Sequence, residues 1–257
     1  MKDRTWELSL AAGLIAVSVL LYALHFVIFK DFHHIAIYTL GDIAFVPIEV
    51  LLVTLIIHRL LEMRETRRKL EKLNMVIGTF FSVVGTRLLA WLSDRDPRLE
   101  EIKSELVVSK EWSADEFQKI RRRLGTYSYT VNISALDLVQ LREFLGGKED
   151  FMIRLLENPV LLEHETFTDL LRATFHLTEE LLKRKDLSSC PETDLAHLKG
   201  DIERVYGLLV REWLDYMEYL QGAYPYLHSL AMRTNPFDEQ ASVTVQNLRR
   251  WASDGIR

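Results

Sequence analysis

Two long apolar runs near the N-terminus constrain this chain more than any other feature. Residues 8–29 contain no formal charge, and residues 35–57 contain only two charged side chains, Asp42 and Glu49. A helix of either length covers roughly 30 Å, the thickness of a bilayer's hydrocarbon core. Because the link at residues 30–34 is short and polar, the two runs must lie antiparallel. Residues 1–60 are therefore predicted to form a two-span transmembrane helical hairpin.

A cleavable signal peptide is the alternative interpretation of the first run. Its apolar region would be about 7–15 residues long and would end at a small-residue cleavage site. The run at residues 8–29 is longer, contains no A-x-A pattern near its end and is followed at once by a second run. We expect an uncleaved anchor.

The distribution of basic residues predicts the orientation of the hairpin. The connecting loop contains only Lys30, and Lys2 and Arg4 precede the first run. Six basic residues follow the second run: Arg59, Arg64, Arg67, Arg68, Lys69 and Lys72. By the positive-inside rule, we expect a multi-pass protein of the cell's inner (cytoplasmic) membrane with both termini in the cytoplasm. The basic cluster could also bind anionic headgroups of the lipid bilayer, or it could only fix the topology.

The remainder of the chain is acidic and contains one cysteine. Residues 93–257 carry 22 Lys and Arg against 29 Asp and Glu, a net charge of −7. This excess of acid argues against nucleic acid as a partner, because phosphate contacts supply most non-specific affinity. The single Cys190 cannot form a disulfide within the chain, which fits a reducing cytosol. We interpret it as a loop cysteine rather than a nucleophile.

Residues 61–92 form a transition between the membrane and the soluble part. The basic stretch can continue the second span as a helical stalk, since residues 59–74 contain no Gly or Pro. Residues 75–92 contain one charge, Arg87. They could be a buried helix of the soluble core, an amphipathic helix at the membrane interface or a third span. Their length and mixed polar face favour the first two.

Residues 93–257 are predicted to form a cytoplasmic, all-α domain, a bundle of five to seven helices. Ser113 and Glu116 form a capping-box pattern. The expected helices are at residues 113–124, 134–145, 150–158, 167–185, 194–221, 226–233 and 242–253, and Pro97 is also a favourable helix start. Along 194–221, an apolar stripe that includes Ile202, Val205 and Leu209 predicts a buried face, and Asp201 flanks it. We expect residues 94–257 to be soluble and helical on their own. If residues 75–92 belong to the core, a fragment that starts at residue 75 should melt at a higher temperature.

Two acidic residues inside the second span are the strongest functional candidates. Insertion of a central acid costs about 2.5–3.5 kcal/mol, so such residues usually face a bundle interior or water. Asp42 and Glu49 are seven residues apart and project from nearly the same helix face.

The geometry of a hairpin predicts which residues could meet these acids. If the turn is centred near Phe32, residues whose numbers sum to about 64 lie at the same depth. Tyr22 is then level with Asp42, and His25 is near Thr39. Glu49 has only apolar residues at its level, which predicts a homo-oligomer formed through the spans or a water-filled path.

Two clusters in the soluble part could bind a metal ion or a ligand. The metal candidates are His164, Glu165, His176, Glu180, His197 and Asp201. Their helical spacing resembles that of carboxylate and histidine ligands in helical bundles, although acids at helix N-termini and surface ion pairs have the same pattern. The aromatic residues between 213 and 237 could line a ligand pocket, but aromatics at helical spacing more often form a core. The identity of any cofactor is unknown.

Three functional hypotheses follow. The sequence contains no G-x-x-x-x-G-K-[ST], G-x-S-x-G or H-E-x-x-H, which counts against the common enzyme classes that carry them. The favoured hypothesis is a membrane-tethered interaction or sensor module with a cytoplasmic protein partner. The alternatives are an oligomeric cation channel or transport component lined by Asp42 and Glu49, and a metal-dependent enzyme in the cytoplasmic bundle.

Overall fold

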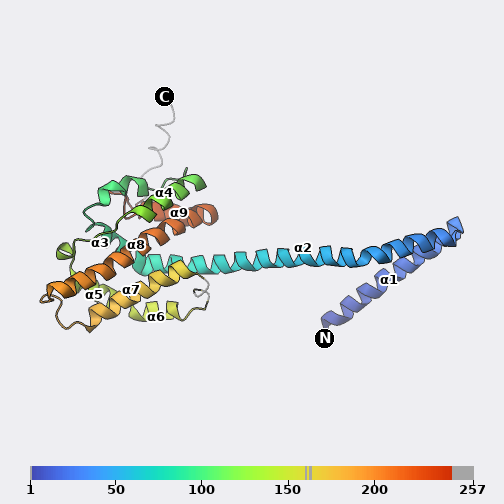
Figure 1. Cartoon of the computed structure of the whole chain (residues 1–257), viewed down its shortest axis with the longest axis horizontal. Coiled ribbons are helices and arrows are strands. Elements are labelled where there is room, and N and C mark those ends of the chain that lie inside the picture. The colour runs from blue at the N-terminus through green and yellow to red at the C-terminus, as the bar shows by residue number, and fades with distance from the viewer. Residues whose placement is uncertain (1, 160, 162–163, 245–257) are drawn as a thin grey trace, which may run out of the picture. The chain divides into compact units, whose positions relative to one another are not determined.

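The computed structural model describes residues 2–159, 161 and 164–244, with the backbone alone at 2–5, 7–8 and 67–69. The described residues are all-helical, without a β-strand, which confirms the predicted all-α class (Figure 1). The α-helices are α1 Lys2–Phe29, α2 Phe32–Phe80, α3 Thr86–Ser93, α4 Ala114–Thr126, α5 Leu138–Gly146, α6 Glu149–Leu156, α7 Glu165–Lys183, α8 Glu192–Ala223 and α9 Pro225–Arg233.

The chain divides into two compact units, residues 1–67 and 68–257. In the first unit, a tight turn joins α1 to α2. Lys30 adopts a left-handed conformation with φ 51°, and its N–H donates to the Phe26 carbonyl at 2.9 Å, which closes the end of α1. The Asp31 carboxylate then accepts the N–H of His34 at 3.1 Å and caps the start of α2.

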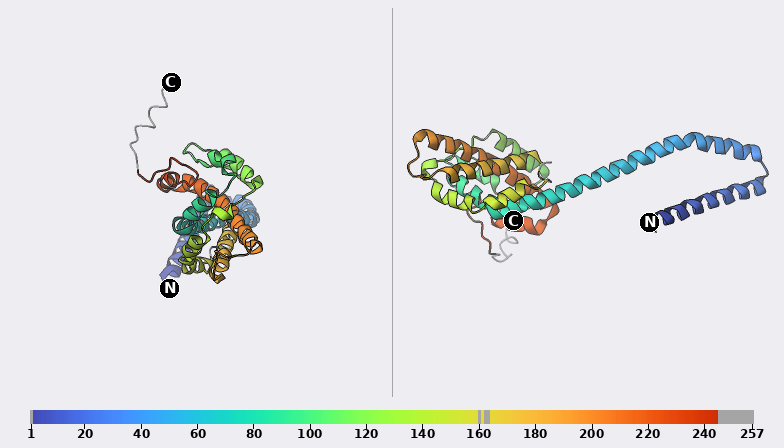
Figure 2. Two further views of the ribbon diagram at one scale, coloured as in Figure 1. Left: turned by 90° about the vertical axis from the view of Figure 1, so that its left-hand side faces the viewer. Right: turned by 90° about the horizontal axis from the view of Figure 1, so that it is seen from below.

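Two candidate spans, which start at Ser9 within α1 and at Phe32 of α2, are long and apolar enough to cross a membrane, a criterion of length and composition only. Their most apolar windows have no buried residue. The two helices meet at the turn and diverge away from it (Figure 2). Pro47 lies inside α2 without ending it.

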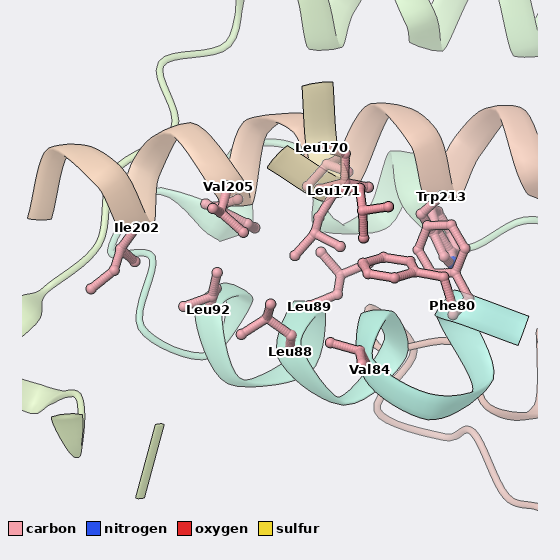
Figure 3. Close-up of a cluster of buried hydrophobic side chains, with 14 of the residues drawn as sticks. Phe80, Val84, Leu88, Leu89, Leu92, Leu170, Leu171, Ile202, Val205 and Trp213 are labelled. Atoms are coloured by element: carbon pink, nitrogen blue, oxygen red, sulfur yellow. The ribbon is translucent and has the colours of Figure 1, made fainter. Parts of the chain in front are cut away.

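In the second unit, residues 75–92 form part of the hydrophobic core. The end of α2 passes through a single π-helical stretch, Phe81–Gly85, into α3. Figure 3 shows Phe80, Val84 and Leu88 of this segment pointing toward side chains of the 165–183 and 192–223 helices. Phe80 has 0% exposure. Of the three alternatives for residues 75–92, the structure therefore has the buried core helix, and the compact unit begins at Arg68 rather than near residue 93.

Helix α8 is the centre of the second unit and packs against α3, α4, α7 and α9. The apolar stripe predicted for this helix faces the core, where Ile202, Val205 and Leu209 are fully buried. The predicted capping box at the start of α4 is also present. The Glu116 N–H donates to the Ser113 hydroxyl at 3.3 Å, and the Glu116 carboxylate accepts the Ser113 N–H at 2.6 Å.

Three predicted helices differ from the structure. Pro97 does not open an α-helix but precedes two short 3₁₀ turns, Leu99–Glu101 and Lys103–Leu106. The helix expected at 134–145 begins later, as α5, because the Asp137 carboxylate accepts the N–H groups of Val139 and Gln140 and caps it there. Residues 133–135 form a short 3₁₀ turn before it. Of the helix expected at 242–253, residues 245–253 lie outside the described part of the chain.

Candidate functional sites

The first candidate site lies in the hairpin, where Tyr22 and Asp42 meet. The Tyr22 hydroxyl donates to the Asp42 carboxylate at 3.4 Å. This contact agrees with the prediction that the two residues lie at the same depth in the hairpin. His25 and Thr39 are both half-buried, and the ring of His25 is stacked against that of His34 with centroids 5.9 Å apart. Asp42 therefore has a hydrogen-bonding partner within a single chain.

A cavity of about 480 Å³ opens beside this pair, between α1 and α2 near the turn. Its lining residues are Ser18, Leu21, Tyr22, His25, His34, Ile35 and Tyr38. The Nδ1 atom of His25 is buried and has no hydrogen bond to any described residue. Sequence reasoning missed His34 and Tyr38 because it looked only for partners at the depth of the two acids.

Glu49 differs from Asp42 because no described group of the hairpin forms a hydrogen bond with it. Its side chain is exposed on the single chain and has no hydrogen bond or ion pair to any residue that the structure describes. The carboxyl group is therefore free to meet lipid, water or a neighbouring molecule.

The basic residues after the second apolar run are spread along α2. Arg59, Arg64 and Lys72 are exposed, so their charges are available to solvent or to lipid headgroups. The side chains of Arg67, Arg68 and Lys69 lie outside what the structure describes.

Four of the six metal candidates meet between α7 and α8. The Asp201 Oδ2 atom lies 3.6 Å from His176 Nε2 and 3.4 Å from His197 Nε2. His197 Nε2 is 3.7 Å from the Glu180 carboxylate. Asp201 is only 4% exposed, whereas the sequence placed it beside the buried stripe. Its Oδ2 atom has no hydrogen bond within the described chain.

The other two metal candidates lie elsewhere, so the six residues do not form one site. His164 caps the start of α7, where its Nδ1 atom accepts the Phe167 N–H at 3.3 Å, and Glu165 is the first residue of that helix. Twelve residues of helical rise separate His164 from His176, roughly 18 Å. Among the described residues, no group of three or more His, Cys, Asp or Glu side chains is placed to hold a metal ion.

Arg184 forms ion pairs with two carboxylates, Glu180 of this cluster and the neighbouring Asp194. Its guanidinium binds both oxygens of Asp194, at 2.8 and 2.6 Å, and reaches the Glu180 carboxylate at 2.7 Å. These contacts lower the pKa of Asp194 to about 2 and also lower the pKa of Glu180. Both acids therefore act here as ion-pair partners of Arg184, a common structural arrangement.

A groove of about 540 Å³ lies beside the same cluster, along α7 and α8. Arginines of both helices line it, together with His176, Gly207 and Tyr129. The arginines are Arg172, Arg204 and Arg211. Sequence reasoning missed them, although Arg204 and Arg211 are seven residues apart on one helix and so share a face.

The aromatic residues and Cys190, which the sequence also raised as candidates, lie in surroundings that fit a structural role. Trp213 packs edge-on against Phe237, and Tyr216 stacks on Phe81, so these aromatics belong to the core. Cys190 is half-buried, and burial raises the pKa of its thiol. A nucleophilic cysteine needs the opposite shift.

Glu212 is a buried acid that sequence reasoning did not single out. It lies on α8 beside Trp213 and is 3% exposed. Burial raises its pKa from 4.5 to about 7, an effect that a hydrogen bond to the Thr166 side chain partly offsets. Between these two pH values the unfolded chain has released this proton while the folded chain keeps it, so stability falls as the pH rises through that window.

Substitution of Glu212 by Gln is expected to remove this loss of stability. The shift corresponds to about 3 kcal/mol between pH 4.5 and pH 7. Thermal unfolding of the full chain in detergent at pH 5 and pH 8 measures it. Relative to the parent, Glu212→Gln should gain stability at pH 8 and change little at pH 5. An equal effect at both pH values would contradict this account.

Comparison with known proteins places the chain in a family. Residues 69–233 match the family described as "Uncharacterized protein MJ1433, C-terminal helical domain", and residues 2–61 match "MJ1433, N-terminal helical domain". The chain is 46% identical to uncharacterized protein MJ1433 of Methanocaldococcus jannaschii over 243 residues, which cover 95% of this chain and 98% of that protein. No solved structure matches the chain. The two matched regions follow the two compact units closely. The chain thus belongs to the MJ1433 family of two-part helical proteins.

Proposed function

We propose that the chain is an integral membrane protein in which the hairpin anchors the acidic helical domain at the cytoplasmic face, as an interaction or sensor module. The observation that carries the proposal is the exposure of the hairpin's apolar surface. Leu20, Phe29 and Leu40 are among the many large apolar side chains of α1 and α2 that lie exposed. A soluble protein rarely exposes so large a continuous apolar surface, whereas lipid covers it at no cost.

The second unit supports the other half of the proposal. It has its own buried core, and residues 68–257 carry 26 Lys and Arg against 30 Asp and Glu, a net charge of −4. The basic residues between the apolar runs and this core favour a cytoplasmic position for it. A compact acidic domain next to a bilayer can bind a cytoplasmic protein partner without being drawn onto anionic lipid.

Glu49 favours one alternative, an oligomer of hairpins that conducts cations. Asp42 has a partner in its own chain, but Glu49 has none among the described residues. A carboxyl group near the middle of a bilayer needs a hydrogen-bonding neighbour or water. A second copy of this hairpin could supply the hydrogen-bonding neighbour directly. Several copies together could instead enclose a water-filled path.

Substitutions at Glu49 separate the tethered module from the channel. Glu49→Gln keeps the size and can still donate a hydrogen bond, so it is expected to leave assembly intact. Glu49→Leu is expected to weaken assembly by about 0.6–2 kcal/mol if the acid bonds across subunits. The measurements are the mass of the protein in detergent and cation flux into liposomes. Asp31→Asn in the loop is the control variant, because asparagine removes the charge and still caps α2.

The two functions predict different results for Glu49→Gln. If the variant's oligomer is intact and its cation flux equals that of the parent, the result fits the tethered module. If the oligomer is intact and the flux is lower than that of the parent, the result fits a cation path. If the protein is monomeric at every concentration, the channel hypothesis is excluded. If Glu49→Leu matches the parent in both measurements, Glu49 neither bonds across subunits nor lines a path.

A further inference from the structure

The groove along α7 and α8 concentrates positive charge on an acidic domain. Arg172, Arg204 and Arg211 line it, and all three side chains are exposed. The domain as a whole has a net negative charge, so the presence of three arginines along one groove does not follow from its composition. A local basic surface on an acidic protein attracts anions selectively to one place.

The three guanidinium groups have few partners in the protein. Arg211 donates from Nε to the Gly207 carbonyl at 3.0 Å, and Arg204 reaches the buried Asp201 carboxylate at 3.2 Å. Arg172 has no hydrogen bond or ion pair to any residue that the structure describes. Each guanidinium has five N–H donors. Most of the donors that line the groove are therefore available to a ligand.

Two carboxylates also line the groove, but one of them is already occupied. Glu203 accepts hydrogen bonds from the Thr130 hydroxyl at 2.9 Å and the Val131 N–H at 3.1 Å, and it pairs with Lys199 at 3.6 Å. Asp169 is the remaining carboxylate in the lining. The groove thus has three arginines, whereas Asp169 is the one carboxylate of its lining that is left to oppose them.

The apolar part of the lining limits what kind of ligand fits. The ring of Tyr129 lies directly over the backbone of α8, because a Cβ atom at Gly207 would be 2.9 Å from it. Ala173 and Leu208 complete this part of the surface. The volume of about 540 Å³ is within the range of small-molecule sites.

We propose that this groove binds a small organic molecule through a phosphate group held by Arg172, Arg204 and Arg211, with its apolar part against Tyr129. The planar guanidinium fork matches the oxygens of a phosphate and can bind it through two parallel hydrogen bonds. The proposal does not depend on membrane attachment, because all the residues that it uses lie in the second unit. Free organic phosphates and phosphorylated lipid headgroups share this chemistry.

The first test uses phenyl phosphate as a probe of the full chain in a non-ionic detergent. Isothermal titration calorimetry is expected to show binding of phenyl phosphate and none of phenol, which lacks the phosphate. Arg172→Gln should weaken binding about 10-fold or more. Asp169→Asn should strengthen it, because it removes a repelling charge. Arg122→Gln, an exposed arginine of α4 outside the groove, should leave it unchanged.

The second test asks whether the phosphate comes from lipid. The full chain is placed in phosphatidylcholine nanodiscs with and without phosphatidic acid, and retained lipid is measured by native mass spectrometry. Retention of phosphatidic acid that Arg172→Gln reduces and Arg122→Gln does not supports a headgroup as the ligand. The proposal is overturned if neither probe binds, or if Arg172→Gln and Arg122→Gln weaken binding alike.

Discussion

A fragment that begins at residue 94 is expected to lose cooperative unfolding, whereas one that begins at Arg68 should unfold in a single sharp transition. The physical reason is the core position of the segment before residue 94. Eight apolar side chains there are buried: Leu73, Ile77, Phe80, Phe81, Val84, Leu88, Leu89 and Leu92. All eight belong to one hydrophobic core cluster with side chains of α7 and α8. Figure 3 shows five of them, Phe80, Val84, Leu88, Leu89 and Leu92, beside side chains of these two helices.

The free energy that this burial contributes is large compared with the stability of a whole domain. Complete burial of one such side chain contributes about 1.5–3 kcal/mol, so eight contribute roughly 12–24 kcal/mol as an upper estimate. A folded domain is typically stable by only about 5–15 kcal/mol. Removing the segment also uncovers Leu170, Leu171 and Trp213, which then face water. The remaining helices can form locally but lack a complete core. The fragment 94–257, which the sequence predicted to fold on its own, is therefore expected to keep helicity without stable packing.

Circular dichroism and tryptophan fluorescence during urea titration of the two fragments measure this effect. Residues 68–257 should give coincident, sigmoidal transitions by both probes. Residues 94–257 should give a broad change in helicity and bind a hydrophobic dye before urea is added. A fragment 94–257 that unfolds as sharply and at the same urea concentration as 68–257 would contradict the assignment of residues 75–92 to the core.

Local patterns in the sequence predicted much of this fold. The length and composition of the two apolar runs predicted both helices of the hairpin, and the short link between them predicted that Tyr22 would meet Asp42. The spacing of Ser113 and Glu116 predicted the start of α4. The apolar stripe of α8 predicted its buried face. Each of these features depends on residues close in sequence or on a rigid helical period.

Features that depend on distant parts of the chain could not be predicted in this way. Residues 75–92 are apolar enough for a core, an interface or a membrane, and only packing against α7 and α8 distinguishes these environments. The buried position of Asp201 likewise depends on how α7 covers α8. The groove joins Tyr129, Arg172 and Arg211 from three separate segments, and no motif links them in the sequence. Glu212 lies beside the buried Trp213, but helical periodicity alone does not show how far the core extends around α8.

The orientation of the hairpin is the claim on which the proposed function depends most. Six basic residues follow the second apolar run and one lies in the loop, so the loop is expected outside the cell and the domain inside. His33 in the first turn of α2 and Thr193 in the first turn of α8 are both exposed, and neither caps a helix. Asp31 is less suitable for substitution because it caps α2.

Cysteine accessibility in whole cells tests this orientation directly. The native Cys190 is first replaced by Ser, and His33→Cys and Thr193→Cys are then made separately in that background. A membrane-impermeant maleimide should label position 33 in intact cells and position 193 only after the membrane is made permeable. Labelling of position 193 but not 33 in intact cells would invert the topology, and labelling of neither position in intact cells but both in the soluble fraction after lysis would show that the chain is not a membrane protein.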